Sequence, residues 1–130
     1  MSASRRAVTA DGAPAAVGPY SHAVAHGGLL FCSGQMPLDP ATGELVESGL
    51  DEQTTRCLEN LSVVCAAGGA QLTDAVRCGI YVTDIATFNE VNTAYARYFP
   101  GAPPARTLIG VAALPLGAAV EIDAIVALPS

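Results

Sequence analysis

The sequence predicts an α+β fold, in which two helices pack on one face of a mixed β-sheet. The residue patterns give the element order β-β-β-α-β-α-β-β within 130 residues, 51% of them hydrophobic, enough for one domain with a modest core. Both helices follow strands, yet neither begins with a glycine-rich nucleotide-binding pattern. The terminal strands are largely apolar, so the uncovered sheet face is expected to meet another copy of the chain.

The N-terminal third is predicted to supply three strands. Residues 5–10 form a plausible first strand, and an irregular loop rich in Gly and Pro covers residues 11–20. Residues 23–25 and 29–33 lie on either side of His26-Gly27-Gly28 and are predicted to form a tight hairpin.

After a predicted turn at residues 39–43, the hydrophobic period changes to that of a helix. Asp51 and Glu52 would occupy the first helical turn, where the helix dipole favours acidic side chains, and Gly68-Gly69 would end the helix. The predicted buried stripe comprises Leu50, Cys57, Leu58, Leu61, Val64 and Cys65.

A strand and a second helix follow. Residues 76–82 alternate as a strand with one buried face does, and Asp84 is placed to cap a helix that ends before Pro100. The inward stripe of this helix is predicted to be Phe88, Val91, Tyr95 and Tyr98.

Single charges interrupt the last two strands, at Arg106 and Glu121. Burying an unpaired charge costs several kcal/mol, so each is expected either to be paired or to be held for a ligand. Residues 114–117 are predicted to form the turn of a hairpin, which would set the two charges about 13 Å apart along the ladder. At that distance, Arg106 and Glu121 would not form a salt bridge within one hairpin. Alternation groups Arg106 with Leu108 and Gly110, and Glu121 with Asp123 and Ile125.

Composition excludes several classes of function. All six basic residues are arginine, and the net charge is −6. The lack of lysine excludes a Schiff-base lysine and a P-loop, and scattered arginines in an acidic chain argue against a nucleic-acid partner. No apolar run reaches the roughly 18–20 residues of a membrane helix, and no apolar segment follows the first six residues as in a secretory signal. We therefore expect a cytoplasmic protein without a membrane partner.

Neither a metal site nor a disulfide framework is expected. His22 and His26 are four residues apart, but the surrounding Pro and Gly residues argue against a shared helical face. The cysteines lack C-x-x-C spacing and lie in apolar patterns, which predicts buried free thiols. They are Cys32, Cys57, Cys65 and Cys78.

Five separated segments form a specific combination, although none is specific alone. They are residues 13–21 (APAAVGPYS), 31–37 (FCSGQMP), 39–43 (DPATG), 92–95 (NTAY) and 104–125. Together they resemble the RidA/YjgF family of enamine/imine deaminases, essentially from end to end. The resemblance implies a single RidA-like domain (residues 1–130) with a chorismate-mutase-like fold, and a homotrimer with a barrel-like core and active sites between subunits. It also implies hydrolysis of 2-aminoacrylate and related 2-imino acids to 2-oxo acids and ammonia, without a cofactor.

By the same resemblance, Arg106 would bind the substrate carboxylate and Glu121 would position the attacking water. A planar guanidinium can hold a small carboxylate through two hydrogen bonds, which turns C2 toward that water. The implied substrate-binding residues are Tyr20, Ser33, Asn92, Leu108 and, through its backbone, Gly34.

Each residue also has a structural interpretation. Arg106 could pair with Asp123 or with a neighbouring subunit, and Glu121 could be satisfied by backbone amides. For the remaining residues, the alternatives are Tyr20 covering the core, Ser33 bonding to backbone, and Asn92 fastening a helix end.

Two departures from the common family pattern bear on the substrate. Leu108 stands where many enamine deaminases have cysteine, and the loop at residues 98–104 is shorter than in many members. The alternatives are therefore a pathway-specific deaminase of a larger enamine or imine, and a protein that binds a small carboxylate without turnover. Ribonuclease activity, also attached to the family, is disfavoured by the acidic, lysine-free composition.

Overall fold

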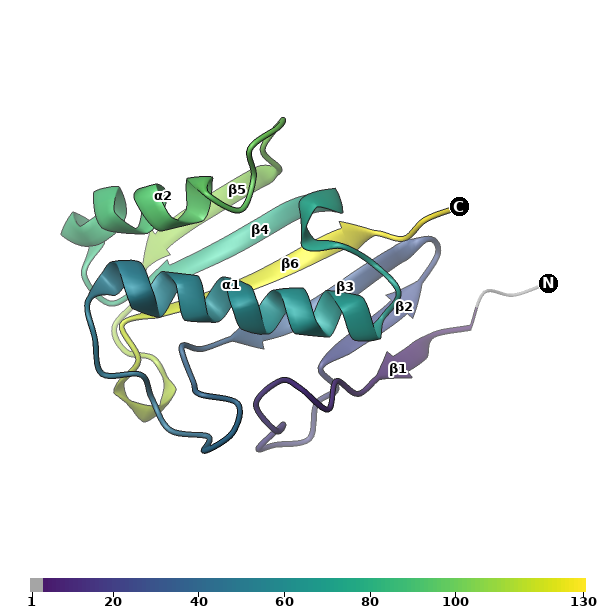
Figure 1. The fold of residues 1–130 in the computed structure, drawn as a ribbon, viewed down its shortest axis with the longest axis horizontal. Coiled ribbons are helices and arrows are strands. Elements are labelled where there is room, and N and C mark those ends of the chain that lie inside the picture. The colour runs from purple at the N-terminus through teal and green to yellow at the C-terminus, as the bar shows by residue number, and fades with distance from the viewer. Residues whose placement is uncertain (1–3) are drawn as a thin grey trace.

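A computed structural model describes residues 4–130 and confirms the predicted α+β fold (Figure 1). One six-stranded sheet has the strand order β1-β2-β3-β6-β4-β5. The strands are β1 (Arg6–Val8), β2 (Ala23–His26), β3 (Leu29–Gln35), β4 (Ala75–Val82), β5 (Ala105–Gly110) and β6 (Val120–Ala127). The helices are α1 (Leu50–Ala67) and α2 (Phe88–Ala96), and short 3₁₀ turns occupy Leu72–Asp74, Ile85–Thr87 and Pro115–Gly117.

The N-terminal segment inspected for a secretory signal includes residues 1–3, which lie outside the described residues. Within residues 4–130, no helix combines the length and apolar character needed to cross a membrane.

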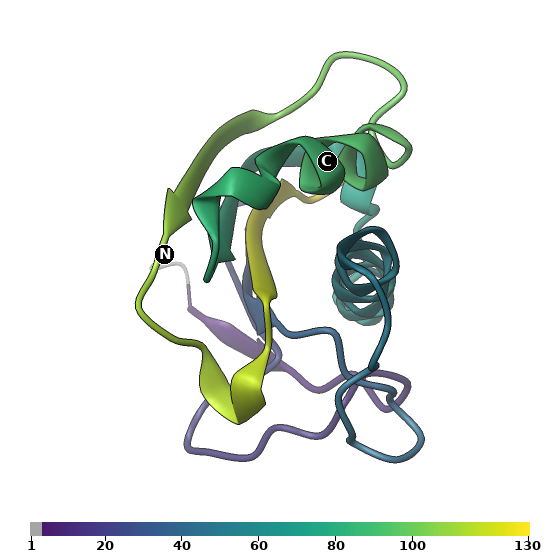
Figure 2. The same cartoon turned by 90° about the vertical axis from the view of Figure 1, so that its left-hand side faces the viewer.

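Both helices lie on the same side of the sheet, as Figure 2 shows. The first helix agrees closely with its prediction, since Asp51 and Glu52 lie in its first turn and Gly68 caps its end. The Gly68 N–H donates to the carbonyl oxygens of Val64 and Cys65, at 3.1 and 3.0 Å. These bonds satisfy carbonyl groups that a helix end otherwise leaves without partners.

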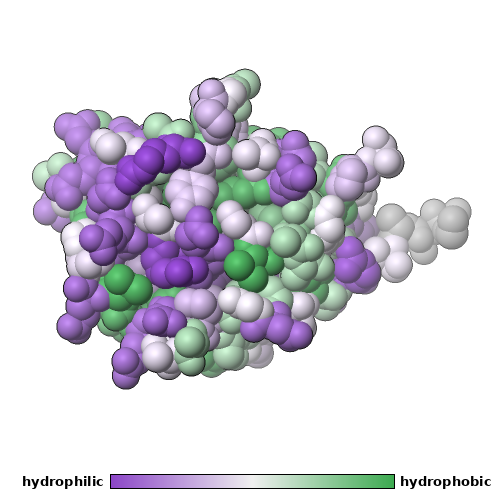
Figure 3. Space-filling model, in the orientation of Figure 1, coloured by the Kyte–Doolittle hydropathy of each residue, from purple (hydrophilic) through white to green (hydrophobic). Residues whose placement is uncertain are grey.

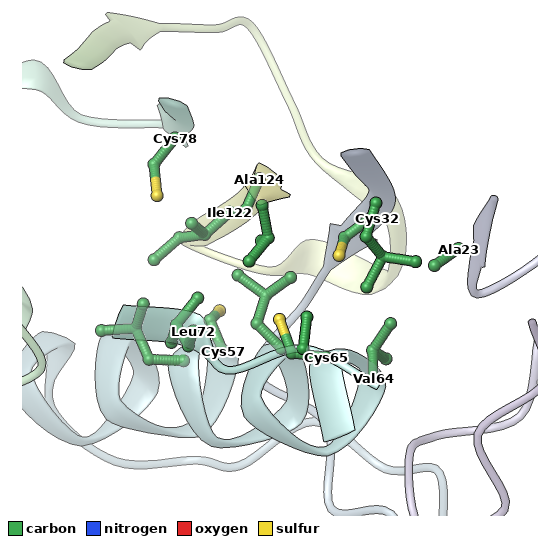
Figure 4. Packing of buried hydrophobic residues seen from close by; sticks show 14 of the residues in the cluster. Ala23, Cys32, Cys57, Val64, Cys65, Leu72, Cys78, Ile122 and Ala124 are labelled. Atoms are coloured by element: carbon green, nitrogen blue, oxygen red, sulfur yellow. The ribbon is translucent and has the colours of Figure 1, made fainter. Parts of the chain in front are cut away.

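The core lies between this helix layer and the sheet. In β6 the buried residues alternate with half-buried ones, so that Val120, Ile122, Ala124 and Val126 face the helices. All four cysteines are buried and free, as predicted, and Figure 4 shows their side chains among the apolar ones. Burial raises the pKa of the Cys57 thiol, which keeps it protonated and unreactive.

The hairpin between β2 and β3 is also as predicted. Gly27 and Gly28 both have positive φ, at 61° and 80°, which is the backbone of the two-residue turn that connects strands most tightly. The turn at residues 39–43 forms as well, with the Gly43 N–H donating to the Asp39 carbonyl oxygen at 2.7 Å.

The hairpin predicted for the last two strands is wrong. β4 lies between β5 and β6, pairing with β5 in parallel and with β6 antiparallel. The reason is that β4, α2 and β5 form a β-α-β unit, whose right-handed crossover brings β5 back beside β4. The later β6 then occupies the free edge of β4, between β4 and β3. The facing predicted by alternation is correct, but the 13 Å separation along a shared ladder is not, because the two strands share no ladder.

The start of the second helix also differs from the prediction. Asp84 does act as a cap, but it caps the 3₁₀ turn at Ile85–Thr87, where its carboxylate accepts the Ala86 N–H at 3.1 Å. Phe88 is 44% exposed rather than buried, whereas Val91 and Tyr95 are buried as predicted. Phe88 is the first residue of α2 and directly follows the 3₁₀ turn, whose period of three residues differs from that of the predicted stripe.

His22 is a structural residue that ties the N-terminal loop to the start of β2. Its ring is 5% exposed; Nδ1 accepts the Ala10 N–H at 2.9 Å, and Nε2–H donates to the Pro14 carbonyl oxygen at 2.8 Å. Both ring nitrogens are therefore occupied in one neutral tautomer. Within residues 4–130, no group of three His, Cys, Asp or Glu side chains is arranged to hold a metal ion.

Replacing this buried histidine, in His22→Ala, is expected to lower the free energy of unfolding by about 2–4 kcal/mol, because it leaves a cavity and two unpaired backbone groups. Urea titration at fixed protein concentration would measure the loss. The control is His26→Ala, at an exposed position, for which we expect a change within about 0.5 kcal/mol. Equal stability of the two variants would contradict the anchoring role.

Candidate active site

Six of the seven predicted site residues, all except Leu108, line two separate hollows of one chain. Asn92 and Arg106 line a hollow of about 450 Å³ between α2 and β5, together with Tyr95, Ala96, Phe99, Gly101, Pro103 and Pro104. A second hollow of about 350 Å³ is lined by Tyr20, Ser33, Gly34 and Glu121, together with Val17, Met36 and Pro115. Below, these are called the arginine hollow and the glutamate hollow.

In the arginine hollow, Arg106 is held by α2. Its Nη1 donates to Asn92 Oδ1 at 2.7 Å, and its guanidinium carbon lies 5.1 Å from the centre of the Tyr95 ring. Within residues 4–130 Arg106 forms no salt bridge, so the alternative pairing with Asp123 is not made in this chain. Because only one donor is used by Asn92, the remaining N–H groups are free to hold a carboxylate.

Asn92 lies in the hollow and faces the arginine rather than fastening the helix end. Leu108, two residues after Arg106 on β5, is half-buried and packs against the core. It is not among the residues that line either hollow.

In the glutamate hollow, the carboxylate of Glu121 lies directly against Gly34. A Cβ atom built on Gly34 would collide with Glu121 Oε2, so only glycine leaves room for the carboxylate there. Burial, and then the charge of Asp123, raise the pKa of Glu121. The hydrogen bonds found among residues 4–130 include none to this carboxylate, so backbone amides do not satisfy it. A carboxylate with a raised pKa and no protein partner is suited to hold a water and accept its proton.

Asp123 is fixed beside Glu121 by two contacts from β4. Its Oδ1 accepts the Gly79 N–H at 3.0 Å, and its Oδ2 accepts the Tyr81 hydroxyl at 2.8 Å. The sequence interpretation did not include Gly79 or Tyr81 in the site. The strand alternation could have placed them there, because both lie on the β4 face opposite the buried Cys78 and Ile80.

The remaining predicted residues differ in what they contact. The Ser33 hydroxyl donates to the Ser21 carbonyl oxygen at 2.6 Å, which is the structural alternative for that residue. Tyr20 does not cover the core, since it is 47% exposed and its hydroxyl accepts the Val17 N–H at 3.4 Å. Both side chains still line the glutamate hollow.

The two hollows open on different faces of the sheet. Arg106 pairs with Cys78 on β4 and so points to the helix-covered face, whereas Glu121 pairs with Tyr81 and points to the uncovered face. One chain therefore does not bring Arg106 and Glu121 to the same small ligand.

A third hollow, of about 550 Å³, lies between α1 and α2. Figure 3 shows that hydrophilic side chains gather on the face of the molecule that carries these helices. Several of its polar side chains already have partners, because Arg97 pairs with Asp51, Arg56 donates to Asn60, and the Tyr98 hydroxyl donates to Glu59. This groove therefore has the character of a solvated helix surface rather than of a reaction site.

Comparison with known proteins identifies the family. A sequence model described as Endoribonuclease L-PSP matches residues 10–128. The crystal structure of RidA from the Antarctic bacterium Psychrobacter sp. PAMC 21119 has a TM-score of 0.91 and 39% identity, and the match covers 95% of this chain and 99% of that chain. The chain belongs to the RidA/YjgF family.

Two further relatives extend the comparison of this RidA-family chain. Protein DfrA of Myxococcus xanthus is 52% identical over 123 residues, which are 93% of this chain and 94% of DfrA. A protein of Capra hircus named 2-iminobutanoate/2-iminopropanoate deaminase is 42% identical over 121 residues, 93% of this chain and 88% of that protein. The family to which this chain belongs therefore includes imine deaminases.

Proposed function

We propose that this protein hydrolyses short 2-imino acids, namely 2-aminoacrylate with its imine tautomer 2-iminopropanoate, and 2-iminobutanoate, to 2-oxo acids and ammonia. The observation that carries the proposal is the pairing of functions in the two hollows: a held guanidinium in one, and a carboxylate of raised pKa without a protein partner in the other. The name of the goat relative supports the same reaction. Action in the cytoplasm remains part of the proposal.

The assembly that completes the site is proposed to be a homotrimer. Since the two hollows open on different faces, a substrate that contacts both needs two chains. The uncovered face also carries Phe31 and Ile109, which are 42% and 44% exposed. Packing such faces together into a barrel-like core would bury these apolar side chains and bring the arginine hollow of one chain to the glutamate hollow of the next.

The mechanism follows from the two groups. Arg106 binds the substrate carboxylate through two N–H donors and so fixes the imine carbon C2. Glu121 accepts a proton from a water as the water oxygen bonds to C2, and the C=N bond becomes a C–N single bond. Glu121 then gives this proton to the amino nitrogen and the C–N bond breaks, so that ammonia leaves. The C=O bond of the 2-oxo acid forms as Glu121 accepts the proton of the C2 hydroxyl. Because a protonated imine is already electrophilic, the proposal requires no cofactor.

The test is a coupled assay in which a threonine dehydratase, present in excess, makes 2-iminobutanoate so fast that hydrolysis of the imine limits the release of 2-oxobutanoate. The wild-type protein is expected to accelerate this release in proportion to its concentration. A well-folded protein that gives no acceleration would remove the proposed reaction. Binding of 2-oxobutanoate, measured by calorimetry, would then distinguish a non-catalytic carboxylate-binding protein.

A larger imine is the second candidate substrate, and one observation favours it. The arginine hollow is lined largely by apolar groups, including Phe99, Pro103 and Pro104, which would suit a longer apolar substituent. The same assay, with imines made from larger amino acids by an amino-acid oxidase, would decide between the two substrate classes. This candidate predicts weak turnover of the three- and four-carbon imines and higher turnover of the larger ones.

The glycine under the catalytic carboxylate gives a sharp variant. In Gly34→Ala the new methyl group must displace the Glu121 carboxylate, and a shift of about 1 Å costs up to roughly 10²-fold in rate. We expect kcat in the coupled assay to fall about 10- to 100-fold while the fold persists. The control is Gly49→Ala, where a Cβ atom meets no atom within 4 Å. Similar kcat values for the two variants would show that the contact with Gly34 is unimportant.

A further inference from the structure

Tyr95 is the residue on which the Arg106 guanidinium rests. Its ring is 5% exposed and leans against Phe99, with the two ring centres 4.7 Å apart and the planes at 41°. The opposite neighbour is the guanidinium, 5.1 Å from the ring centre. The sequence pattern of α2 accounts for the burial of Tyr95 as a core residue, but it does not account for the position of Arg106 over its face.

Resting on the function proposed above, we propose that Tyr95 is a positioning residue for Arg106, whose guanidinium it holds with Asn92 in one orientation for the substrate carboxylate. Asn92 fixes one terminal nitrogen through the 2.7 Å hydrogen bond. The aromatic face restrains the guanidinium plane, because a cation is attracted to the electron-rich face of the ring. Arginine has a long and flexible side chain, so this restraint lowers the entropy lost when the carboxylate binds.

The hydroxyl of Tyr95 takes no part in this arrangement. The hydroxyl is buried and has no hydrogen-bond partner among residues 4–130. The Cys78 thiol lies near it, but the geometry is not that of a hydrogen bond. Burial also raises the pKa of Tyr95, so the hydroxyl does not serve as an acid or base near neutral pH. The positioning role therefore belongs to the ring, and phenylalanine is expected to replace tyrosine.

This gives a pair of variants that separates positioning from packing. Tyr95→Phe keeps the aromatic face and removes an unpartnered hydroxyl, whereas Tyr95→Leu keeps an apolar side chain and removes the face. We expect Tyr95→Leu to weaken 2-oxobutanoate binding, measured by calorimetry, and to raise KM for the imine by roughly 3- to 30-fold. The value of kcat should fall less than this. Tyr95→Phe should stay within about twofold of wild type in both constants.

Val91→Ala is the matched control, because Val91 is fully buried on the same helix and has no contact with the guanidinium among the interactions described. It should lower stability and leave 2-oxobutanoate binding unchanged. If Tyr95→Leu does not fold, Tyr95→Met, which also lacks an aromatic face, carries the same expectation.

Three results would overturn the positioning role: wild-type binding by the folded non-aromatic variant, an equal loss in Tyr95→Phe, or an equal loss in Val91→Ala. Wild-type protein that does not bind 2-oxobutanoate would overturn it as well. Binding without turnover by wild type would remove the proposed reaction alone, because the calorimetric comparison still tests the positioning of Arg106.

Discussion

Replacing Glu121 by glutamine is expected to lower kcat for imine hydrolysis by about 10²- to 10⁴-fold, the usual contribution of a general base. Glutamine has the same shape and still fits beside Gly34, but it cannot accept the proton of the attacking water. KM should change little, because Arg106 and its contacts with Asn92 and Tyr95 remain intact. A Glu121→Gln variant with wild-type kcat would exclude this residue as the base.

The raised pKa of Glu121 makes the pH dependence part of the same prediction. The base works in its ionised form, so kcat of the wild type should fall as the pH drops through a value above the ordinary 4.5 of glutamate. In the Glu121→Gln variant, the residual kcat should not show this fall at low pH.

Glu121→Gln should stabilise the folded protein at neutral pH although it lowers the activity. Since the folded state raises this pKa, folding favours the protonated carboxyl, and that contribution is lost as the pH rises through the folded pKa. Glu121→Gln should therefore have a higher Tm than wild type at neutral pH. The two Tm values should converge as the pH falls below the ordinary glutamate value, and a lower Tm of the variant at neutral pH would contradict the burial argument.

Replacing Arg106 by alanine is expected to lower kcat/KM by roughly 10²- to 10⁴-fold, because two charge-assisted hydrogen bonds to the carboxylate are lost. Arg106→Lys should recover only part of the loss, since an ammonium group cannot reproduce the planar pair of donors or rest on Tyr95 in the same way. Steady-state kinetics and calorimetry with 2-oxobutanoate would measure both variants. An unchanged KM in Arg106→Ala would place the carboxylate elsewhere.

Mixing the two inactive variants tests whether a site is shared between chains. In a trimer whose sites each take Arg106 from one chain and Glu121 from the next, random assembly of equal amounts leaves about a quarter of the sites intact. Co-refolding Arg106→Ala with Glu121→Gln should thus restore about that fraction of activity. Failure of well-mixed trimers to regain activity would contradict a shared site.

Local patterns were sufficient for the elements but not for the order of the last strands. The limits of α1 and the hairpin at Gly27 and Gly28 follow from short-range rules on helix ends and turns. The order β6-β4-β5 follows from how β4, α2 and β5 cross over the sheet, which the alternation within a strand does not contain.

Some residues of the candidate site could likewise be predicted from the sequence, and others could not. Arg106 and Glu121 could be predicted because each places a charge in an otherwise apolar strand, where charge is costly. The role of Tyr95 could not, because an aromatic residue on a buried helical stripe looks the same whether it only packs or also holds a charged neighbour. Its partner Arg106 comes from β5, so the pattern within α2 does not contain this contact.

The central place of β6 also determines when the chain can finish folding. During synthesis β3 and β4 emerge from the ribosome well before the strand that must lie between them, so their facing edges wait without partners. The sheet can close only after residue 127 is available, and its pairings join distant parts of the chain, which favours slow folding. Until β6 is available, the nascent chain therefore exposes strand edges with which other chains can pair.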